Sequence, residues 1–379
     1  MREEDSWRDA PSEANTTPNA SMKGTPRGTV EAAAPSAVVL ATPEPENKRN
    51  QRPSGLIKSA EMGEEDGEQP LPTTICGTFS CHGLDEGKGK ANQDCACYSY
   101  PLKNDNEAAL FVVLDGHGDT GDLVSNELLS QVANRLVADH WKKEEAELTA
   151  QFVKAFEEAH HHMLTFQVDP ATGMAPAQQS GAVGVAMVLR HGKACLAWAG
   201  DCRAIMGTAD DAGQLVCVEL THDHKLEDGG EEQHRIEATG AFIRPTQEEP
   251  YFSPARVYAD RTNPRKGPGL TMSRSLGDID ADACGVIPTP ECTYRTLQKG
   301  KDKFIVMASD GLWEFLSSEN VCEIVGGFLE RGEDAIQATR FLIAKAAMAW
   351  RVEEGDYRDD ITVIVLYLHD LPSALAPTS

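Results

Sequence analysis

Four apolar segments, far apart in the sequence, each adjoin an aspartate, and this pattern constrains the fold more than any other feature. The segments are residues 111–114 before Asp115, 194–200 before Asp201, 304–309 before Asp310, and 361–368 after Asp359 and Asp360. Short apolar runs with such boundaries are typical of strands buried on both faces. The Gly-His-Gly at residues 116–118 is expected to end the first strand abruptly and to leave Asp115 at the rim of a sheet.

A lone Asp-Gly dipeptide is most simply a hairpin turn, but its repetition after buried strands argues for a shared role. If the four strands belong to one sheet system, their aspartates converge at one rim. Uncompensated carboxylates would repel one another and shift their own pKa values. Bound cations relieve that repulsion, and ligands that are all oxygen favour hard ions such as Mg²⁺ or Mn²⁺ over Zn²⁺. The pattern therefore indicates a site for divalent cations.

Composition and charge exclude several other classes of protein. The formal net charge of −25 argues against nucleic acid or an anionic membrane as the main partner, and it suits a protein that binds cations. No apolar run approaches the ~18 residues of a membrane span, and the acidic N-terminus lacks the apolar stretch of a secretory signal. The ten cysteines form no Cys-x-x-Cys pair, which favours reduced thiols in a cytoplasmic or nuclear protein.

The order of patterns along the chain divides it into three regions. Residues 1–72 are rich in Pro, Ser, Thr, Asn, Ala and Glu and are expected to form a disordered tail. Residues 73–370 are expected to form one folded domain, with a flap insert at about 222–269, and residues 371–379 a C-terminal tail. Strands and two helix pairs alternate within the domain. We therefore predict an α+β fold, an α–β–β–α sandwich of two antiparallel sheets flanked by helix pairs.

Eight short motifs strengthen this interpretation because they occur together and in a fixed order. They lie at residues 92–94 (Asn-Gln-Asp), 115–118 (Asp-Gly-His-Gly), 180–182 (Ser-Gly-Ala), 200–204 (Gly-Asp-Cys-Arg-Ala), 220–225 (Leu-Thr-His-Asp-His-Lys), 273–278 (Ser-Arg-Ser-Leu-Gly-Asp), 308–313 (Ala-Ser-Asp-Gly-Leu-Trp) and 359–362 (Asp-Asp-Ile-Thr). Any one motif alone is a weak signal. Together, across roughly residues 73–369, they resemble the metal-dependent protein Ser/Thr phosphatases of type 2C.

The resemblance implies a binuclear Mg²⁺ or Mn²⁺ site. It implies that Asp115 bridges both ions, that the backbone carbonyl of Gly116 binds one of them, and that Asp310 and Asp359 complete the shell of the other. The usual Asp-Asn before the last strand is Asp-Asp here, and position favours Asp359 over Asp360 as the ligand. Two such cations clamp the phosphate and lower the pKa of a shared water from near 16 towards ~7, which supplies hydroxide at neutral pH.

The resemblance also assigns roles around the two ions. Asp94 is implied to hold metal-bound water, and Asp201 to help bind a third, weaker ion. His117 is implied to be the general acid, because the leaving seryl or threonyl oxygen needs a proton and an imidazole with a pKa near ~6.5 can give one. The implied substrates are phosphoproteins that carry phosphoserine or phosphothreonine.

Two positions depart from the family's usual pattern. Many members carry a phosphate-gripping Arg five residues before Asp94, and this chain has Gly89 there. Lys88 or Lys90 is expected to bind phosphate instead, as a point charge without the bidentate fork of Arg. Asp119 replaces the usual Gly after the Asp-Gly-His-Gly motif, and it adds negative charge near the site.

Other functions fit the sequence less well. A Cys-dependent phosphatase needs Cys-x₅-Arg, and no cysteine here has Arg six residues later. Residues 278–280 (Asp-Ile-Asp) are similar to an aspartyl-phosphate motif, but no long apolar strand precedes them to position a nucleophile. A pseudophosphatase that keeps the fold as a binding or scaffold protein stays open, with the missing Arg in its favour and the retained ligands against it. We expect a monomer.

Overall fold

The computed structural model describes residues 70–138, 141, 144–226, 230–247, 253–260, 262 and 267–377, together with the backbone of residues 39–40. The disordered tail expected at residues 1–72 lies almost entirely outside these described residues. No helix among them combines the length and the apolar character that crossing a membrane requires.

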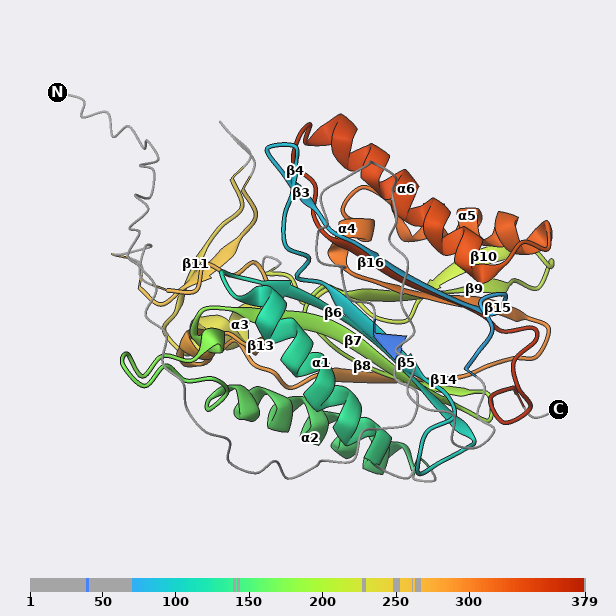
Figure 1. The fold of residues 1–379 in the computed structure, drawn as a ribbon, viewed down its shortest axis with the longest axis horizontal. Helices are drawn as coiled ribbons and strands as arrows, with labels where there is room; N and C mark the ends of the chain where they lie inside the picture. Colours follow the sequence, from blue (N-terminus) through green and yellow to red (C-terminus); the bar gives the residue numbers. More distant parts are fainter. Residues whose placement is uncertain are drawn as a thin grey trace, which may run out of the picture. The chain divides into compact units, whose positions relative to one another are not determined.

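Two antiparallel sheets pack face to face at the centre of the fold (Figure 1). The seven-stranded sheet has the order β1–β5–β6–β7–β8–β14, with β13 paired to β7, and the five-stranded sheet has the order β10–β9–β15–β16–β2. The strands of the first sheet are β1 (Val39–Leu40), β5 (Cys95–Ser99), β6 (Ala108–His117), β7 (Gly181–Arg190), β8 (Lys193–Ala199), β13 (Leu276–Gly277) and β14 (Glu291–Thr296). Those of the second are β2 (Cys76–Cys81), β9 (Arg203–Ala209), β10 (Leu215–Glu219), β15 (Asp302–Ala308) and β16 (Ile361–Tyr367).

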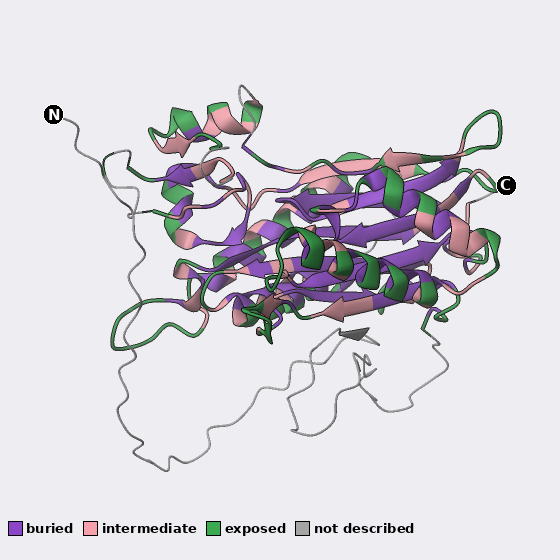
Figure 2. Cartoon of the chain, turned by 90° about the horizontal axis from the view of Figure 1, so that it is seen from above, coloured by how far each residue is buried: buried purple, intermediate pink, exposed green. Residues whose placement is uncertain are grey.

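Helices cover the outer face of each sheet. The seven-stranded sheet is covered by α1 (Gly121–Ala138) and α2 (Glu145–Met163), and the five-stranded sheet by α5 (Ser318–Glu330) and α6 (Ala335–Glu353), with the short α4 (Asp310–Trp313) beside them. One apolar core lies between the two sheets. A second lies between the seven-stranded sheet and its helices, and a third lies between the five-stranded sheet and its helices. Figure 2 shows buried strands beneath helices whose outer turns are exposed. The predicted α–β–β–α sandwich is confirmed.

The strand β6 explains why its sequence is apolar without alternation. Successive side chains of a strand point to opposite faces of its sheet. One set of β6 side chains packs in the core beneath α1 and α2, namely Ala108, Leu110, Val112 and Leu114. The alternate set packs in the core between the sheets, namely Ala109, Phe111 and Val113. Both faces are therefore dry, and a polar residue first becomes possible where the strand reaches the rim.

The prediction that Gly-His-Gly at residues 116–118 ends this strand abruptly is wrong. β6 continues through Asp115, Gly116 and His117, all of which pair with β7. A Cβ at residue 116 would lie only 2.5 Å from the carbonyl oxygen of Gln93. This strand position therefore requires glycine, although the chain does not turn there. The turn comes at Gly118, whose φ of 86° suits glycine.

The insert at 222–269 has regular structure of its own. It contains α3 (Glu231–Ala238) and the antiparallel pair β11 (Phe242–Arg244) and β12 (Arg256–Tyr258). A fourth, small apolar core holds these elements to the segment around Val286. The insert is therefore anchored through packed side chains as well as through its chain ends.

The strand β14 was not expected from the sequence. Its six residues are at most half-buried, because it lies at the edge of the seven-stranded sheet, so it lacks a continuous apolar run. The remaining short elements are β3 (Leu84–Asp85), β4 (Lys88–Gly89) and the 3₁₀ turns η1 (Pro176–Gln178) and η2 (Ile279–Cys284). A local pattern is too weak to reveal elements this short.

The folded region extends beyond the expected limits of 73 and 370. Leu71, Leu371 and Leu375 are buried in the core between the sheets. The backbone N–H groups of His191 and Gly192 donate to the carbonyls of residues 374 and 375 over 2.9 and 2.8 Å. Residues 371–377 are therefore part of the domain and not the free tail that the sequence suggested.

We expect Leu375→Ala to lower the free energy of unfolding by about 2–5 kcal/mol, because it opens a cavity at a side chain that is fully buried. Urea denaturation followed by tryptophan fluorescence measures this change. Val168→Ala, at an exposed position, is the control and should change the free energy of unfolding by less than about 0.5 kcal/mol. Equal stability of the two variants would contradict the anchoring of the C-terminal segment.

Candidate active site

Five aspartates from distant parts of the chain meet at one rim of the sandwich. Asp115 belongs to β6, and the charges of the four others act directly on it, namely Asp94, Asp201, Asp310 and Asp359. The antiparallel ladders explain the meeting, because the end of β6 pairs with the start of β7, and the end of β15 pairs with the start of β16. The convergence that the sequence predicted is thus present in the fold.

Burial and mutual repulsion make these carboxyl groups hard to ionise together. Burial first, and then the charges of the neighbouring aspartates, raise the pKa values of Asp115 and Asp310 well above their usual range. The same two causes raise the pKa of Asp94 to about 7, although a hydrogen bond from Ser309 opposes the shift. Such a cluster needs either protons or cations to offset its charge.

Asp94 has the geometry expected of a group that holds a further ligand. It is buried, and its Oδ2 accepts a hydrogen bond of 2.6 Å from the Ser309 hydroxyl. Its Oδ1 is also buried and accepts none from the described protein groups. A buried carboxylate oxygen without a partner is costly, and a cation-bound water would satisfy it. The oxygen-only donor set and this free atom both fit hard divalent cations.

The paired aspartates before β16 are distinguished by their hydrogen bonds. Both oxygens of Asp360 accept backbone N–H groups, from Gly83 over 2.5 Å and from Gln93 over 2.8 Å, and its side chain is buried. Asp360 therefore fastens two loops together. Asp359 is half-buried and its charge acts on Asp115, which supports the choice of Asp359 as the ligand.

The two lysines expected near the phosphate lie in different surroundings. Lys90 Nζ contacts Asp359 Oδ1 at 2.6 Å and Asp360 Oδ2 at 3.6 Å. Burial alone would lower the pKa of Lys90, but the charge of Asp359 raises it above the usual range. Lys88 lies on the β3–β4 hairpin, its side chain is 83% exposed, and it pairs with Glu86 at 3.8 Å. The geometry therefore favours Lys90 over Lys88 as a group of the site.

His117 forms a hydrogen bond that the sequence did not reveal. Its Nε2 lies 2.6 Å from Oδ2 of Asp278, which also accepts from the Ser275 hydroxyl at 2.6 Å. Burial alone would lower the pKa of His117, but the Asp278 carboxylate raises it. Asp278 lies in one of the eight motifs, and its buried position fits an orienting partner of His117 better than a nucleophile.

Asp201 is buried at the same rim and is partly compensated by a lysine. Burial raises the pKa of Asp201, while Lys225, with its Nζ 4.0 Å away, lowers it. Lys225 also lies 3.7 Å from Asp223, which Arg203 binds through two hydrogen bonds of 3.1 and 2.7 Å. Lys225, Asp223 and Arg203 therefore form a chain of ion pairs that starts at Asp201. The sequence did not predict a role for these three residues.

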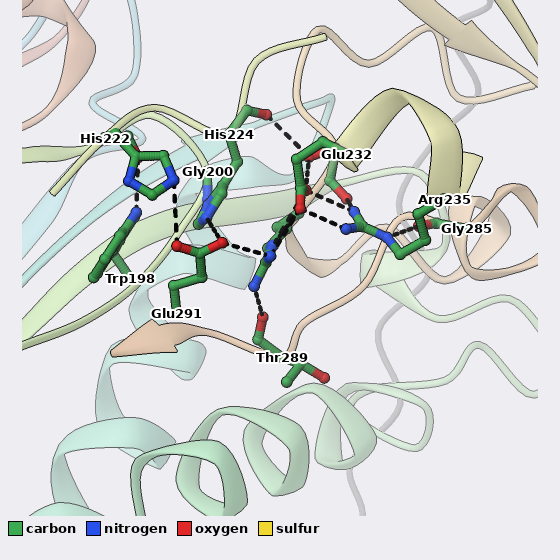
Figure 3. Close-up of polar contacts among 11 residues, drawn as sticks. Trp198, Gly200, His222, His224, Glu232, Arg235, Gly285, Thr289 and Glu291 are labelled. Carbon is green, nitrogen blue, oxygen red and sulfur yellow. Dashed lines mark hydrogen bonds and ion pairs between the residues drawn. The ribbon is translucent and has the colours of Figure 1, made fainter. Parts of the chain in front are cut away.

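A second group of potential metal ligands lies where the start of the insert meets β14 (Figure 3). Ligand atoms of His222, His224 and Glu291 lie within 4.8 Å of one another. His224 Nδ1 accepts from the backbone N–H of Gly200 at 3.0 Å, so the neutral ring carries its proton on Nε2 and that nitrogen has no lone pair for a metal. Glu291 is already paired with Arg274 at 2.8 Å. The chemistry therefore argues for a hydrogen-bonded network and against a metal centre.

The same network anchors the insert to the sheets. Glu232 of α3 accepts two hydrogen bonds from Arg235, of 2.6 and 2.7 Å (Figure 3). It also accepts one of 2.7 Å from Arg274 Nη2. Burial would raise the pKa of Glu232, but these guanidinium groups hold it below its usual range. A charge that is paired on several sides is a strong point of attachment.

The α–β–β–α sandwich and the carboxylate cluster at its rim together agree with the class of protein that the eight motifs resemble. This chain belongs to the protein phosphatase 2C family: residues 84–354, more than half of the chain, match the family described as "Protein phosphatase 2C". The members of this family are metal-dependent protein phosphatases, so the predicted resemblance is confirmed.

Individual relatives agree with this assignment. "Probable protein phosphatase 2C 34" of Arabidopsis thaliana is 29% identical over 308 residues, which cover 76% of this chain and 80% of that protein. "Probable protein phosphatase 2C 48" of Oryza sativa subsp. japonica is 30% identical over 315 residues, 78% of this chain and 85% of that protein. The solved serine-threonine phosphatase 2C from Toxoplasma gondii superposes with a TM-score of 0.60 at 22% identity, covering 77% of this chain and 94% of that one, and supports the fold.

The raised pKa of Asp94 predicts how the metal-free protein responds to pH. Between the ordinary pKa of an aspartate and about 7, the folded state binds a proton that the unfolded state does not, so stability falls as pH rises through this window. We expect Asp94→Asn to raise the Tm of chelator-treated protein above pH 7 and to flatten its dependence on pH. Differential scanning fluorimetry measures both effects.

Asp211→Asn is the matched control, because that side chain is fully exposed and the substitution should leave the Tm unchanged. Adding Mg²⁺ or Mn²⁺ should raise the Tm of the unaltered protein and raise that of Asp94→Asn less. A lower Tm for metal-free Asp94→Asn would show that the carboxylate stabilises the fold without a cation, contrary to this account.

Proposed function

We propose that this chain hydrolyses phosphoserine and phosphothreonine in proteins at a site that binds two Mg²⁺ or Mn²⁺ ions. The observation that carries the proposal is the convergence of five aspartates on one rim, with a buried Asp94 oxygen that has no protein partner. Membership of the protein phosphatase 2C family supplies the reaction class. When bound, the ions supply Lewis acidity on the phosphate and hydroxide at neutral pH.

The proposed ligand set follows the geometry of the rim. Asp115 is central, because the charges of the other carboxylates all act on it, and this supports its role as the bridging ligand. Asp310 and Asp359 would complete one ion's shell, and Asp94 would orient water through its free oxygen. The backbone carbonyl of Gly116 is proposed as a further ligand, from its place in β6 beside Asp115.

Asp201 is proposed to help hold a third and weaker ion. Lys225 lies 4.0 Å from its carboxylate and compensates part of its charge, which would weaken the binding of a cation there relative to the other two.

His117 is proposed as the general acid, with Asp278 as its positioning residue. The contact with Asp278 uses Nε2 of the ring, so in the imidazolium form the proton on Nδ1 stays available for the leaving seryl or threonyl oxygen. The carboxylate favours that protonated form, since it raises the pKa of His117. A protein nucleophile is not required.

Lys90 is proposed to contact the phosphate in place of the missing Arg. Its ammonium group has three donors, of which the contact with Asp359 uses one. A lysine that already binds a ligand carboxylate would grip phosphate more weakly than a free Arg fork. This feature supports the alternative of a catalytically weak binding or scaffold protein, and the activity assay decides between the two.

The reaction is tested by phosphate release from a phosphothreonine peptide after removal of metal with a chelator. We expect no release until Mn²⁺ or Mg²⁺ is added back, and a loss of at least about a hundredfold in kcat/KM for Asp310→Asn with its far-UV circular dichroism unchanged. Asp211→Asn should retain full activity, since its side chain is exposed and fully solvated. Absence of both activity and metal binding in the unaltered protein would favour the scaffold function.

The role of Asp278 is tested by the pH profile of kcat on the same peptide. The general acid acts in its protonated form, so kcat falls as pH rises through the pKa of His117. Asp278→Asn removes the charge that raises this pKa, and the falling limb should move to lower pH. His117→Ala should remove this limb and cost about 10²–10⁴-fold on the peptide.

Aryl phosphate provides the comparison, because a phenolate leaves without a proton and the same variants should slow it less. Asp280→Asn, at an exposed neighbouring position, is the control for the pH profile. A falling limb at the same pH in Asp278→Asn and the unaltered protein would show that Asp278 does not set the pKa of the general acid.

A further inference from the structure

The outer face of α6 carries a row of exposed apolar side chains. Phe341 is 46% exposed, Met348 68% and Val352 79%, while Leu342 and Trp350 on the opposite face are buried in the core against the five-stranded sheet. Three of the eight exposed large apolar side chains of the described residues thus lie on this one helix. Single exposed apolar residues are ordinary, but a continuous row on one helix face is typical of an interaction surface.

The spacing of this row matches the contact line of a helix pair. Phe341, Ala344, Met348 and Val352 are all exposed and follow one another at intervals of three or four residues. This is the repeat that places side chains in the a and d positions of a coiled coil. From residue 341 to residue 352 the row spans about 16 Å of helix axis at 1.5 Å per residue. Below, these four residues are called the α6 row.

Cations border the α6 row on both sides. At 100° per residue, Lys345 flanks one side of the row and Arg340 and Arg351 flank the other, and all three are exposed. In the part of the chain that the structure describes, no carboxylate forms an ion pair with any of these three side chains. The chain as a whole carries a formal charge of −25, so the border of this row is a local reversal of sign.

We propose that the α6 row binds an acidic amphipathic helix of another protein. Apolar side chains of the partner would pack between Phe341 and Val352, and its flanking Glu or Asp side chains would pair with the border cations, as e and g residues do in coiled coils. At physiological salt the Debye length is about 8 Å, so the local cations outweigh the distant acidic surface.

The charges disfavour a second copy of this chain and an anionic membrane as occupants of such a face. A second copy of this chain would bring the same Arg340, Lys345 and Arg351 to the border, together with its own charge of −25. An anionic membrane would attract three cations but repel the rest of the chain. A helix that carries acidic residues on both sides of an apolar stripe meets neither obstacle.

Two synthetic three-heptad peptides test the proposal against the full-length protein. Both peptides carry Leu at the a and d positions of each heptad. At the flanking e and g positions, one peptide carries Glu and the other carries Lys. We expect fluorescence anisotropy to show binding of the Glu peptide and at least about tenfold weaker binding of the Lys peptide. Met348→Glu, at the centre of the row, should weaken binding of the Glu peptide by at least about tenfold.

Control variants separate this surface from general stickiness. Leu164→Glu introduces the same charge at another exposed apolar position, 44% exposed at the end of α2, and should leave peptide binding unchanged. Lys345→Glu should weaken binding of the Glu peptide and strengthen binding of the Lys peptide. All three variants should keep the unaltered protein's rate on aryl phosphate, because their side chains are exposed on outer helix surfaces.

Four results would overturn the proposal. These are equal binding of both peptides, no binding of either, a dimer in sedimentation velocity that Met348→Glu dissolves, and binding to phosphatidylserine vesicles that Met348→Glu abolishes. The third result would assign the row to a second copy of the chain, and the fourth to a membrane surface.

Discussion

The mutual repulsion of five carboxylates gathered at one rim is the constraint on which the rest of this structure depends. For Asp115 and Asp310, burial beside like charges makes ionisation costly. The fold holds them together because three apolar cores and two antiparallel ladders fix the strand ends that carry them. Apolar packing in the cores thus offsets the unfavourable electrostatic free energy at the rim, as is common at functional sites.

Several groups around the rim reduce this repulsion or satisfy buried oxygens. Lys90 offsets charge at Asp359, and Lys225 offsets charge at Asp201. Ser309 and the two backbone donors of Asp360 satisfy oxygens that are shut off from water. What they leave over, a free oxygen on Asp94 and uncompensated charge at Asp115 and Asp310, is what divalent cations would neutralise. The fold alone therefore sets the positions of these carboxylates and of the groups that offset them.

The sequence revealed the fold class and the aspartates that meet at the rim because both depend on local patterns. Apolar runs such as 361–368 mark strands that are dry on both faces, and an aspartate at their limit marks the rim. Contacts between distant residues left no such trace. His117 and Asp278 are 161 positions apart, and only the completed sheet brings them to 2.6 Å. The edge strand β14 and the buried Leu375 were missed for a related reason, since their partners are set by tertiary packing and not by neighbours in the chain.

The continuation of β6 through residues 115–117 has a consequence for how the reaction centre tolerates motion. Asp115 and His117 are two positions apart on one paired strand, so they point to the same side, and strand geometry sets their Cα atoms about 6.6 Å apart. The paired strand therefore fixes the spacing between the Asp115 carboxylate, which is the proposed bridging ligand, and the His117 imidazole. Movement of the insert or of the surrounding loops would leave this spacing intact, because neither belongs to the β6–β7 ladder. Only a slip of the ladder itself would alter it, and such a slip would turn both side chains away from the rim at once.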